Sequence, residues 1–277
     1  MARRRRAPAR FPVLVVLVVL LALVLAPFLV VAVNAVKSPA DYAAHGPIAW
    51  PRGLHLSGIV DFWHRVDFGR KLLNSFVVSL AVAVLGVTLS VLNAYALGIG
   101  RVRGRLWFLV FFLIANLLPQ EMLVYPLYYL SKSLALYDTL TIVVIVFTVI
   151  QSAFGTYLLS SVYASFPVEL LDAAEVDGAG RLRVLWRIVL PISRPTLSVL
   201  FTFFFIWTWN EFFLPLIFLI SNDNQTVPVA LGVLQGQRLM DATTTSASAL
   251  IGILPAIIFF LVFQRTLTRG IISGAIR

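Results

Sequence analysis

Residues 172–191, DAAEVDGAGRLRVLWRIVLP, form a long charged stretch between runs that are almost free of charge. Three carboxylates come first and three arginines follow: Asp172, Glu175 and Asp177, then Arg181, Arg183 and Arg187. Helix starts favour anions and helix ends favour cations, so this order is typical of two short helices in series. The chemistry available to such a stretch is charge pairing with another protein.

Gly178 divides this stretch, which we call the coupling stretch. Glycine can take the left-handed conformation that ends a helix, Pro167 suits a first helical position, and Pro191 is expected to end a helix. We therefore predict a helix-turn-helix whose second helix ends at Pro191. The small Ala173 and Ala174 would let another protein's backbone approach closely. From the pattern alone, an amphipathic helix lying among lipid headgroups is an equal alternative.

Composition places the chain in a lipid bilayer. Of its 277 residues, 60% are hydrophobic and 12% are charged, which is too apolar for an ordinary soluble domain. The net charge of +10 comes from arginines at the ends of apolar runs, so it predicts membrane topology and no nucleic-acid partner. The chain has no cysteine, and three loop histidines, His45, His55 and His64, favour solvated side chains over a metal site. We predict no metal and no cofactor bound by this chain.

Runs of apolar residues predict an all-α polytopic membrane protein with six transmembrane helices. We expect these spans at about residues 11–36, 72–100, 106–126, 139–163, 196–220 and 246–265. The first run has 26 uncharged positions, about 39 Å of helix, so we interpret it as an uncleaved anchor rather than a signal peptide. The remaining segments are a basic N-terminus (1–10), an extracytoplasmic loop (37–71), a five-span core (72–268) that contains the coupling loop (167–194), and a tail (269–277).

The distribution of lysine and arginine predicts the orientation. Fifteen of these residues lie in the N-terminus, the 101–105 loop, the coupling loop and the tail, whereas seven lie in the other loops. Under the positive-inside rule, both termini and the coupling stretch are cytoplasmic.

The coupling stretch resembles the cytoplasmic coupling loop of ABC importer permeases, whose motif runs Glu-Ala-Ala, two residues, Asp-Gly-Ala, and later Ile-x-Leu-Pro. The matching residues are Ala173, Ala174, Asp177, Gly178, Ala179, Ile188, Leu190 and Pro191. The chain departs from the motif at Asp172, which replaces glutamate, and at Leu185, which replaces phenylalanine. Charge and apolarity are kept at both positions.

The resemblance covers about residues 27–277 and is closest to permeases of the carbohydrate-uptake, maltose-type subfamily. Further stretches carry it: LLNSFVVSLAVAV at 72–84, NAYALG at 93–98, WNEFFLPLIFL at 209–219, VPVALGVLQGQ at 227–237 and FQRTLTRGIISGAIR at 263–277. The last departs from the family ending because Arg277 replaces a lysine.

The resemblance implies a non-catalytic permease subunit in the inner membrane of a prokaryote, importing a sugar or oligosaccharide. It implies partners: a second homologous permease, an ATPase dimer that binds ATP and Mg, and an extracytoplasmic solute-binding protein. The chain has no phosphate-binding loop of its own. The implied ATPase-coupling residues are Asp172, Ala173, Ala174, Glu175, Asp177, Gly178, Ala179 and Pro191, and the implied tail residues near the ATPase are Arg269, Gly274 and Arg277.

Polar and aromatic residues within the predicted spans are candidates for the solute pathway. Asn210 and Glu211 are the strongest, because an ionisable group inside a span is functional by default. An aromatic face beside hydrogen-bonding groups suits a sugar, so Trp207 and Trp209 join them, followed by Gln151 and Asn93. The alternative is that these polar groups bond neighbouring helices.

Two other functions remain open at this point. One is an ABC permease for another polar solute such as glycerol phosphate, since the motifs indicate the coupling machinery and do not identify the transported solute. The other is an ion-coupled secondary transporter, which needs intramembrane carboxylates or broken helices and has only Glu211 and Glu121 available.

Overall fold

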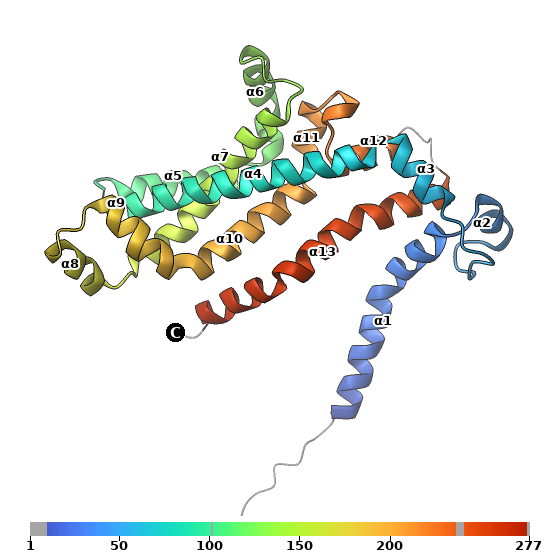
Figure 1. Ribbon diagram of the computed structural model, residues 1–277, viewed down its shortest axis with the longest axis horizontal. Coiled ribbons are helices and arrows are strands. Elements are labelled where there is room, and N and C mark those ends of the chain that lie inside the picture. Colours follow the sequence, from blue (N-terminus) through green and yellow to red (C-terminus); the bar gives the residue numbers. More distant parts are fainter. Residues whose placement is uncertain (1–9, 101, 237–240, 276–277) are drawn as a thin grey trace, which may run out of the picture. The chain divides into compact units, whose positions relative to one another are not determined.

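A computed structural model describes residues 10–100, 102–236 and 241–275, and every regular element in these ranges is a helix (Figure 1). The prediction of an all-α protein is confirmed. The long helices are α1 (Arg10–Ala35), α4 (Phe68–Ala94), α7 (Leu140–Ala164), α10 (Leu190–Asn210) and α13 (Ala242–Ala275). The shorter ones are α2 (Pro39–His45), α3 (Ser57–Arg65), α5 (Arg105–Leu117), α6 (Gln120–Ser133), α8 (Val168–Val176), α9 (Arg181–Val184), α11 (Phe213–Phe218) and α12 (Val227–Gly236), with π-helical turns at Tyr95–Ile99 and Leu185–Val189 and a 3₁₀ turn at Asn222–Asn224.

Five described helical segments are long and apolar enough to cross a membrane: Pro12–Ala35, Phe68–Ile99, Leu140–Ala164, Arg181–Asn210 and Ala242–Gln264. A sixth span exists if α5 and α6 count as one, although they meet at a bend of 97°. The polytopic character is thus confirmed, whereas the expected third span over 106–126 is broken. The break falls at Leu118–Pro119 because the residue before a proline avoids the helical conformation, and Leu118 has φ −69° and ψ 124°.

The chain divides into two compact units. One consists of Met1–Phe68 with Leu231–Leu254, and the other of Gly69–Ala230 with Pro255–Arg277. In the first unit, the buried Lys37 Nζ donates to Asn34 Oδ1 at 3.0 Å and to the Gly46 carbonyl at 3.0 Å. These bonds fix the end of α2 on the end of α1.

In the second unit, α4, α7 and α10 lie side by side, and small residues let them approach closely (Figure 1). A Cβ at Gly155 of α7 would lie 2.2 Å from Ser90 Oγ of α4 and 2.9 Å from Phe204 Cζ of α10. A Cβ at Gly98 would lie 2.7 Å from Tyr163 Cβ. Transmembrane helices lack a hydrophobic driving force for association, so this close van der Waals packing holds them together.

The prediction that the second helix of the coupling stretch ends at Pro191 is wrong. The helix runs from α9 through the π-helical turn into α10, with Pro191 in the first turn of α10. In the π-helical turn, the amide of Leu190 donates to the carbonyl of Leu185, five residues earlier. The π-helical turn changes the backbone register before the proline, so the ring and its missing N–H are accommodated. The coupling stretch is therefore continuous with the span that follows it.

Candidate functional site

The first residues of the coupling stretch belong to helix α8, and α8 ends at the turn that Gly178 was predicted to form. Gly178 has φ +70°, its amide donates to the Glu175 carbonyl at 3.0 Å, and the Ala179 amide donates to the Ala174 carbonyl at 2.9 Å. These two bonds form a Schellman motif, in which a left-handed residue satisfies the last carbonyls of a helix. The turn directs the chain into α9.

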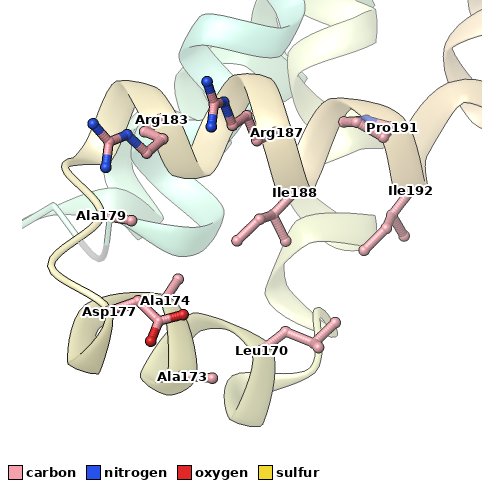
Figure 2. A pocket seen from close by; sticks show the side chains of 10 residues that line it. All are labelled: Leu170, Ala173, Ala174, Asp177, Ala179, Arg183, Arg187, Ile188, Pro191 and Ile192. Atoms are coloured by element: carbon pink, nitrogen blue, oxygen red, sulfur yellow. The ribbon is translucent and has the colours of Figure 1, made fainter.

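A groove lies between α8 and the helix that follows it (Figure 2). Its volume is about 540 Å³, and it is lined by Leu170, Ala173, Ala174, Asp177, Ala179, Arg183, Arg187, Ile188, Pro191 and Ile192. In Figure 2, Ile188 and Ile192 point from the continuous helix toward α8, and the two arginines stand on that helix above them. The groove thus has an apolar floor with charges of both signs beside it.

The charges around α8 have no partner among the residues that the structure describes. Four carboxylates are exposed and accept no hydrogen bond or salt bridge there: Glu169, Asp172, Glu175 and Asp177. The guanidinium groups of Arg183 and Arg187 are equally exposed and unpaired within this part of the chain. Val176, next to these acids, is 88% exposed. A surface with unpaired charges and an exposed apolar side chain is suited to bind a complementary partner.

Although its outer face is open, α8 is anchored to the spans. Ala174 is 5% exposed and belongs to the same buried cluster as Leu159 of α7 and Leu200 of α10. The hydroxyl of Tyr95, in the π-helical turn that follows α4, donates to the Arg181 carbonyl of α9 at 2.9 Å. Packing and this bond therefore connect α8 and α9 to the three spans. Of the two alanines expected to face a partner, Ala173 is exposed and Ala174 faces the core.

The candidate pathway residues do not all share one environment. Gln151 is fully buried and its Nε2 donates to Thr208 Oγ1 at 2.8 Å, while Asn93 Nδ2 donates to Thr156 Oγ1 at 3.3 Å. Both therefore connect neighbouring helices, which was the alternative interpretation. Trp209 is 5% exposed, with its ring 5.8 Å from that of Phe205.

The other candidates are more accessible. Trp207 is partly exposed and packs edge-on against the Phe154 and Phe203 rings. Asn210 is exposed and its Nδ2 donates to the Ile206 carbonyl at 2.7 Å. Glu211 lies in the break between α10 and α11, where its Oε1 accepts from the Phe213 amide at 3.3 Å. Asn210 thus bonds within α10, and Glu211 bonds the first residue of α11.

Sequence reasoning did not find a polar clamp on residues 220–227. On one side Asp138, with φ +61°, accepts through Oδ1 from the Ile220 and Ser221 amides at 2.9 and 3.0 Å. On the other side the first turns of α4 bind the same segment: Arg70 pairs with Asp223, Lys71 donates to the Asn222 carbonyl, Asn74 donates to the Asp223 and Gln225 carbonyls, and Ser75 accepts from the Val227 amide. These α4 partners are about 150 positions from their targets, so no local spacing signals them.

Hydrogen bonding sets the protonation of Asp138. Burial raises the pKa of its carboxyl, but hydrogen bonds from Ser221, Asn224 and Ile220 outweigh burial and hold the pKa below its usual value. The carboxylate is thus charged at neutral pH and strengthens the clamp.

Of the predicted tail residues, Arg269 and Gly274 belong to α13, with their surroundings outside the described part of the structure, and Arg277 lies outside the described residues.

Several apolar helices long enough to cross a membrane, closely packed in the second unit, define a multi-pass membrane protein. Residues 86–273 match the family of binding-protein-dependent transport system inner membrane components, and the chain belongs to this family. It is therefore an ABC transporter permease of the inner membrane.

Individual relatives extend the match. The chain is 31% identical to the sn-glycerol-3-phosphate transport system permease protein UgpE of Yersinia pestis, over 83% of this chain and 82% of that protein. It is 29% identical to the inner membrane ABC transporter permease protein YcjP of Escherichia coli K12, over 100% of both chains. A crystal structure of a bacterial ABC transporter involved in the import of the acidic polysaccharide alginate has the same fold, with a TM-score of 0.77 at 22% identity, covering 96% of this chain and 99% of that one.

Proposed function

We propose that this permease forms half of the translocation pathway of a sugar or oligosaccharide importer and docks to an ATPase subunit through α8 and its groove. One observation carries the proposal. Helix α8 and the residues that follow it expose four carboxylates (Glu169, Asp172, Glu175 and Asp177) and two arginines (Arg183 and Arg187) with no partner in the described chain, and α8 is anchored to the spans. Exposed, unpaired charge favours a binding partner. Because α8 is anchored, movement of that partner would also move the spans.

In this proposal α8 acts as a rigid lever. When ATP binding closes the ATPase dimer, α8 moves with the subunit that holds it, and Ala174 and the Tyr95–Arg181 bond carry the movement to α4, α7 and α10. The coupling free energy is the difference between the contacts that α8 makes in the two states of the transporter. ATP and Mg bind to the ATPase, and this chain supplies the docking surface and the connection from that surface to the spans.

The topology follows from the charge distribution. With six spans and cytoplasmic termini, the coupling stretch faces the ATPase, and the 37–71 and 221–246 loops face an extracytoplasmic solute-binding protein. A second, homologous permease completes the pathway. The clamp around residues 220–227 would then hold one of the docking loops in a fixed position.

The cargo is the least constrained part of the proposal. The carbohydrate class rests on resemblance to the carbohydrate-uptake subfamily and on the alginate importer with the same fold. The relative named for sn-glycerol-3-phosphate keeps another polar organic solute as the second candidate.

The experiment is purification of the detergent-solubilised complex from its native host, with mass spectrometry of the proteins that accompany the chain. We compare wild type with Asp177→Arg, which reverses an exposed charge, and with Gly178→Trp. A Cβ at Gly178 meets nothing within 4 Å in this chain, so the added bulk meets no obstacle of its own chain and the remaining cost is the left-handed backbone. Gly178→Ala controls for this backbone strain, because it adds a Cβ at the same conformation without the bulk of the indole. Gly180→Trp is a second control on equally open surface.

The proposal predicts an ATPase in the wild-type, Gly178→Ala and Gly180→Trp samples and at least a tenfold loss in Asp177→Arg and Gly178→Trp, with all chains equally inserted. If the ATPase accompanies Gly178→Trp as well as it does wild type, α8 is not the docking element. If it accompanies no sample, the importer assignment fails.

A further inference from the structure

Two helix breaks in the second unit each carry a carboxylate. The α5–α6 pair bends by 97° at Leu118–Pro119, and Glu121 lies in the first turn of α6. Helix α10 ends at Asn210, and Glu211 occupies the two-residue break before α11. The two glutamates are 90 positions apart in the sequence.

The fold brings these two carboxylates into one neighbourhood. Helix α6 packs on α11, since Val124 and Leu127 contact the buried cluster that contains Leu214 and Phe218. Asp138, which follows α6, donates its amide to the carbonyl of Phe218 at the end of α11, so the starts of both helices, with Glu121 and Glu211, lie at the other end of the pair. The start of α6 favours the Glu121 charge and the Phe213 amide binds Glu211, but two like charges across this helix pair repel each other and attract a cationic or hydrogen-bond-donating group.

No cation offsets the pair within the described residues. No lysine, arginine or histidine there forms a salt bridge with either glutamate. The exposed Asn210 has an Nδ2 that is engaged with the Ile206 carbonyl, so its free oxygen adds a further acceptor. One turn earlier, Thr208 binds the amide of Gln151, whose buried Oε1 has no partner.

The free polar atoms at this place are therefore predominantly acceptors. Glutamate carboxylates accept only, and the amide oxygen of the exposed Asn210 accepts as well. Such a set binds groups that donate, namely hydroxyls or amines, and repels phosphate, sulfate and carboxylate. Carboxylates inside or near a span also avoid lipid and face protein or a water-filled cavity.

We propose that Glu121 and Glu211 determine the charge class of the solute, admitting neutral polyhydroxylated or amino-bearing solutes and excluding anions. This inference rests on the proposed function, in which the chain lines half of the pathway. It separates this permease from the relative named for sn-glycerol-3-phosphate and from the importer of acidic alginate, whose named cargoes are anionic.

Thiol chemistry tests the charge at this place directly, because the chain contains no cysteine. A reporter cysteine is placed at Phe212, which is 38% exposed and adjacent to Glu211, and a control cysteine at Tyr129, which is 55% exposed near the end of α6. Both are introduced into the full transporter in proteoliposomes. The probes are a cationic methanethiosulfonate (2-trimethylammonioethyl) and an anionic one (2-sulfonatoethyl). For each cysteine, the rate of modification by the cation is divided by the rate for the anion. This ratio is then normalised to the same ratio for 2-mercaptoethanol in solution.

We expect the normalised cation-to-anion ratio at Phe212→Cys to exceed that at Tyr129→Cys by roughly tenfold. It should fall in Glu121→Gln and in Glu211→Gln, and approach the control value when both changes are present. Each single variant suffices if the double variant fails to assemble. Equal ratios at the two cysteines, or a ratio unaffected by the glutamine variants, would overturn the inference.

A second measurement addresses the solute itself. The solute-binding protein recovered with the complex is titrated with maltose, glucosamine, glucuronate and glycerol 3-phosphate. The inference predicts binding of a neutral or amino sugar, and binding of the anions alone would contradict it. The proposed function is judged separately by recovery of the ATPase, so a complex that contains the ATPase but shows no charge preference refutes only the role of the two glutamates.

Discussion

At the scale of single residues, Gly178 shows most clearly how sequence determines a functional shape. Its left-handed conformation closes α8, and it carries no packing of its own, because a Cβ there meets nothing within 4 Å. Its effect on stability should therefore come from backbone conformation alone.

We predict that Gly178→Ala destabilises the α8–α9 turn by about 1 kcal/mol, the cost of a left-handed conformation for a residue with a Cβ. Gly178→Asn should cost less, and Gly180→Ala should have little effect, because Gly180 has an extended backbone with φ −64° and ψ 157°. Hydrogen exchange of the amides of residues 174–180 measures the effect. Equal exchange in Gly178→Ala and Gly180→Ala would contradict it.

Asp138 acts through charge, and its effect depends on pH. Its pKa is lowered in the folded chain, so folding favours the carboxylate and stability falls with acid. The stabilisation should be complete above about pH 4, the ordinary value for aspartate, and should disappear as the pH falls through the folded-state pKa.

Asp138→Asn should therefore lower the thermal midpoint at pH 7, by an amount equivalent to about 2 kcal/mol for lost charged hydrogen bonds. The gap between variant and wild type should narrow toward pH 3. Thermal unfolding in detergent at several pH values measures this gap. A gap that stays constant with pH would show that the Asp138 charge plays no part in the clamp.

At the scale of elements, close packing of α4, α7 and α10 depends on particular small residues. Gly155 is the tightest of these positions, because a Cβ there would overlap Ser90 Oγ and approach Phe204. We predict that Gly155→Ala destabilises the bundle by about 1–3 kcal/mol, the usual cost of overpacking.

The matched test is compensation. Ser90→Gly removes the atom that a Cβ at Gly155 would strike, so adding it to Gly155→Ala should restore part of the lost thermal midpoint. Fluorescence-detected gel filtration after heating compares the two single variants with the double variant. Strict additivity of the single effects would indicate that the two positions do not share a contact.

The helices and turns also show which features of the fold could be predicted from the sequence. Runs of apolar residues predicted the helices, and the left-handed turn at Gly178 followed from local backbone rules, whereas the expected third span did not include the break at Leu118–Pro119. Pro191 did not follow, because the π-helical turn that accommodates it depends on how the helix is packed and not on the residues beside it. Likewise, the clamp and the pairing of Glu121 with Glu211 arise only when α6, α11 and α4 are brought together, so local patterns carried no sign of them. The coupling residues stay a prediction, and they could be proposed from the sequence because they are contiguous in the chain.

At the scale of the whole molecule, the charge asymmetry predicts the topology. Fifteen lysines and arginines lie in the segments predicted to be cytoplasmic and seven in the others. We predict that Ile48→Cys, 84% exposed, reacts with a membrane-impermeant maleimide in intact spheroplasts, whereas Val176→Cys, 88% exposed, reacts only after permeabilisation. The opposite pattern would invert the topology and place α8 on the wrong side for an ATPase.

The central claim is that the open face of α8 binds the ATPase subunit, and cross-linking in membrane vesicles tests it most directly. Val176→Cys and Ala174→Cys occupy the same helix at 88% and 5% exposure, so they differ chiefly in the side that they present. A maleimide–succinimidyl ester reagent joins the thiol to nearby lysines. We predict that the ATPase is cross-linked to Val176→Cys, with a yield that changes when ATP is added, and is at least tenfold less cross-linked to Ala174→Cys. Equal yields from both cysteines, or no ATPase with Val176→Cys, would contradict the account.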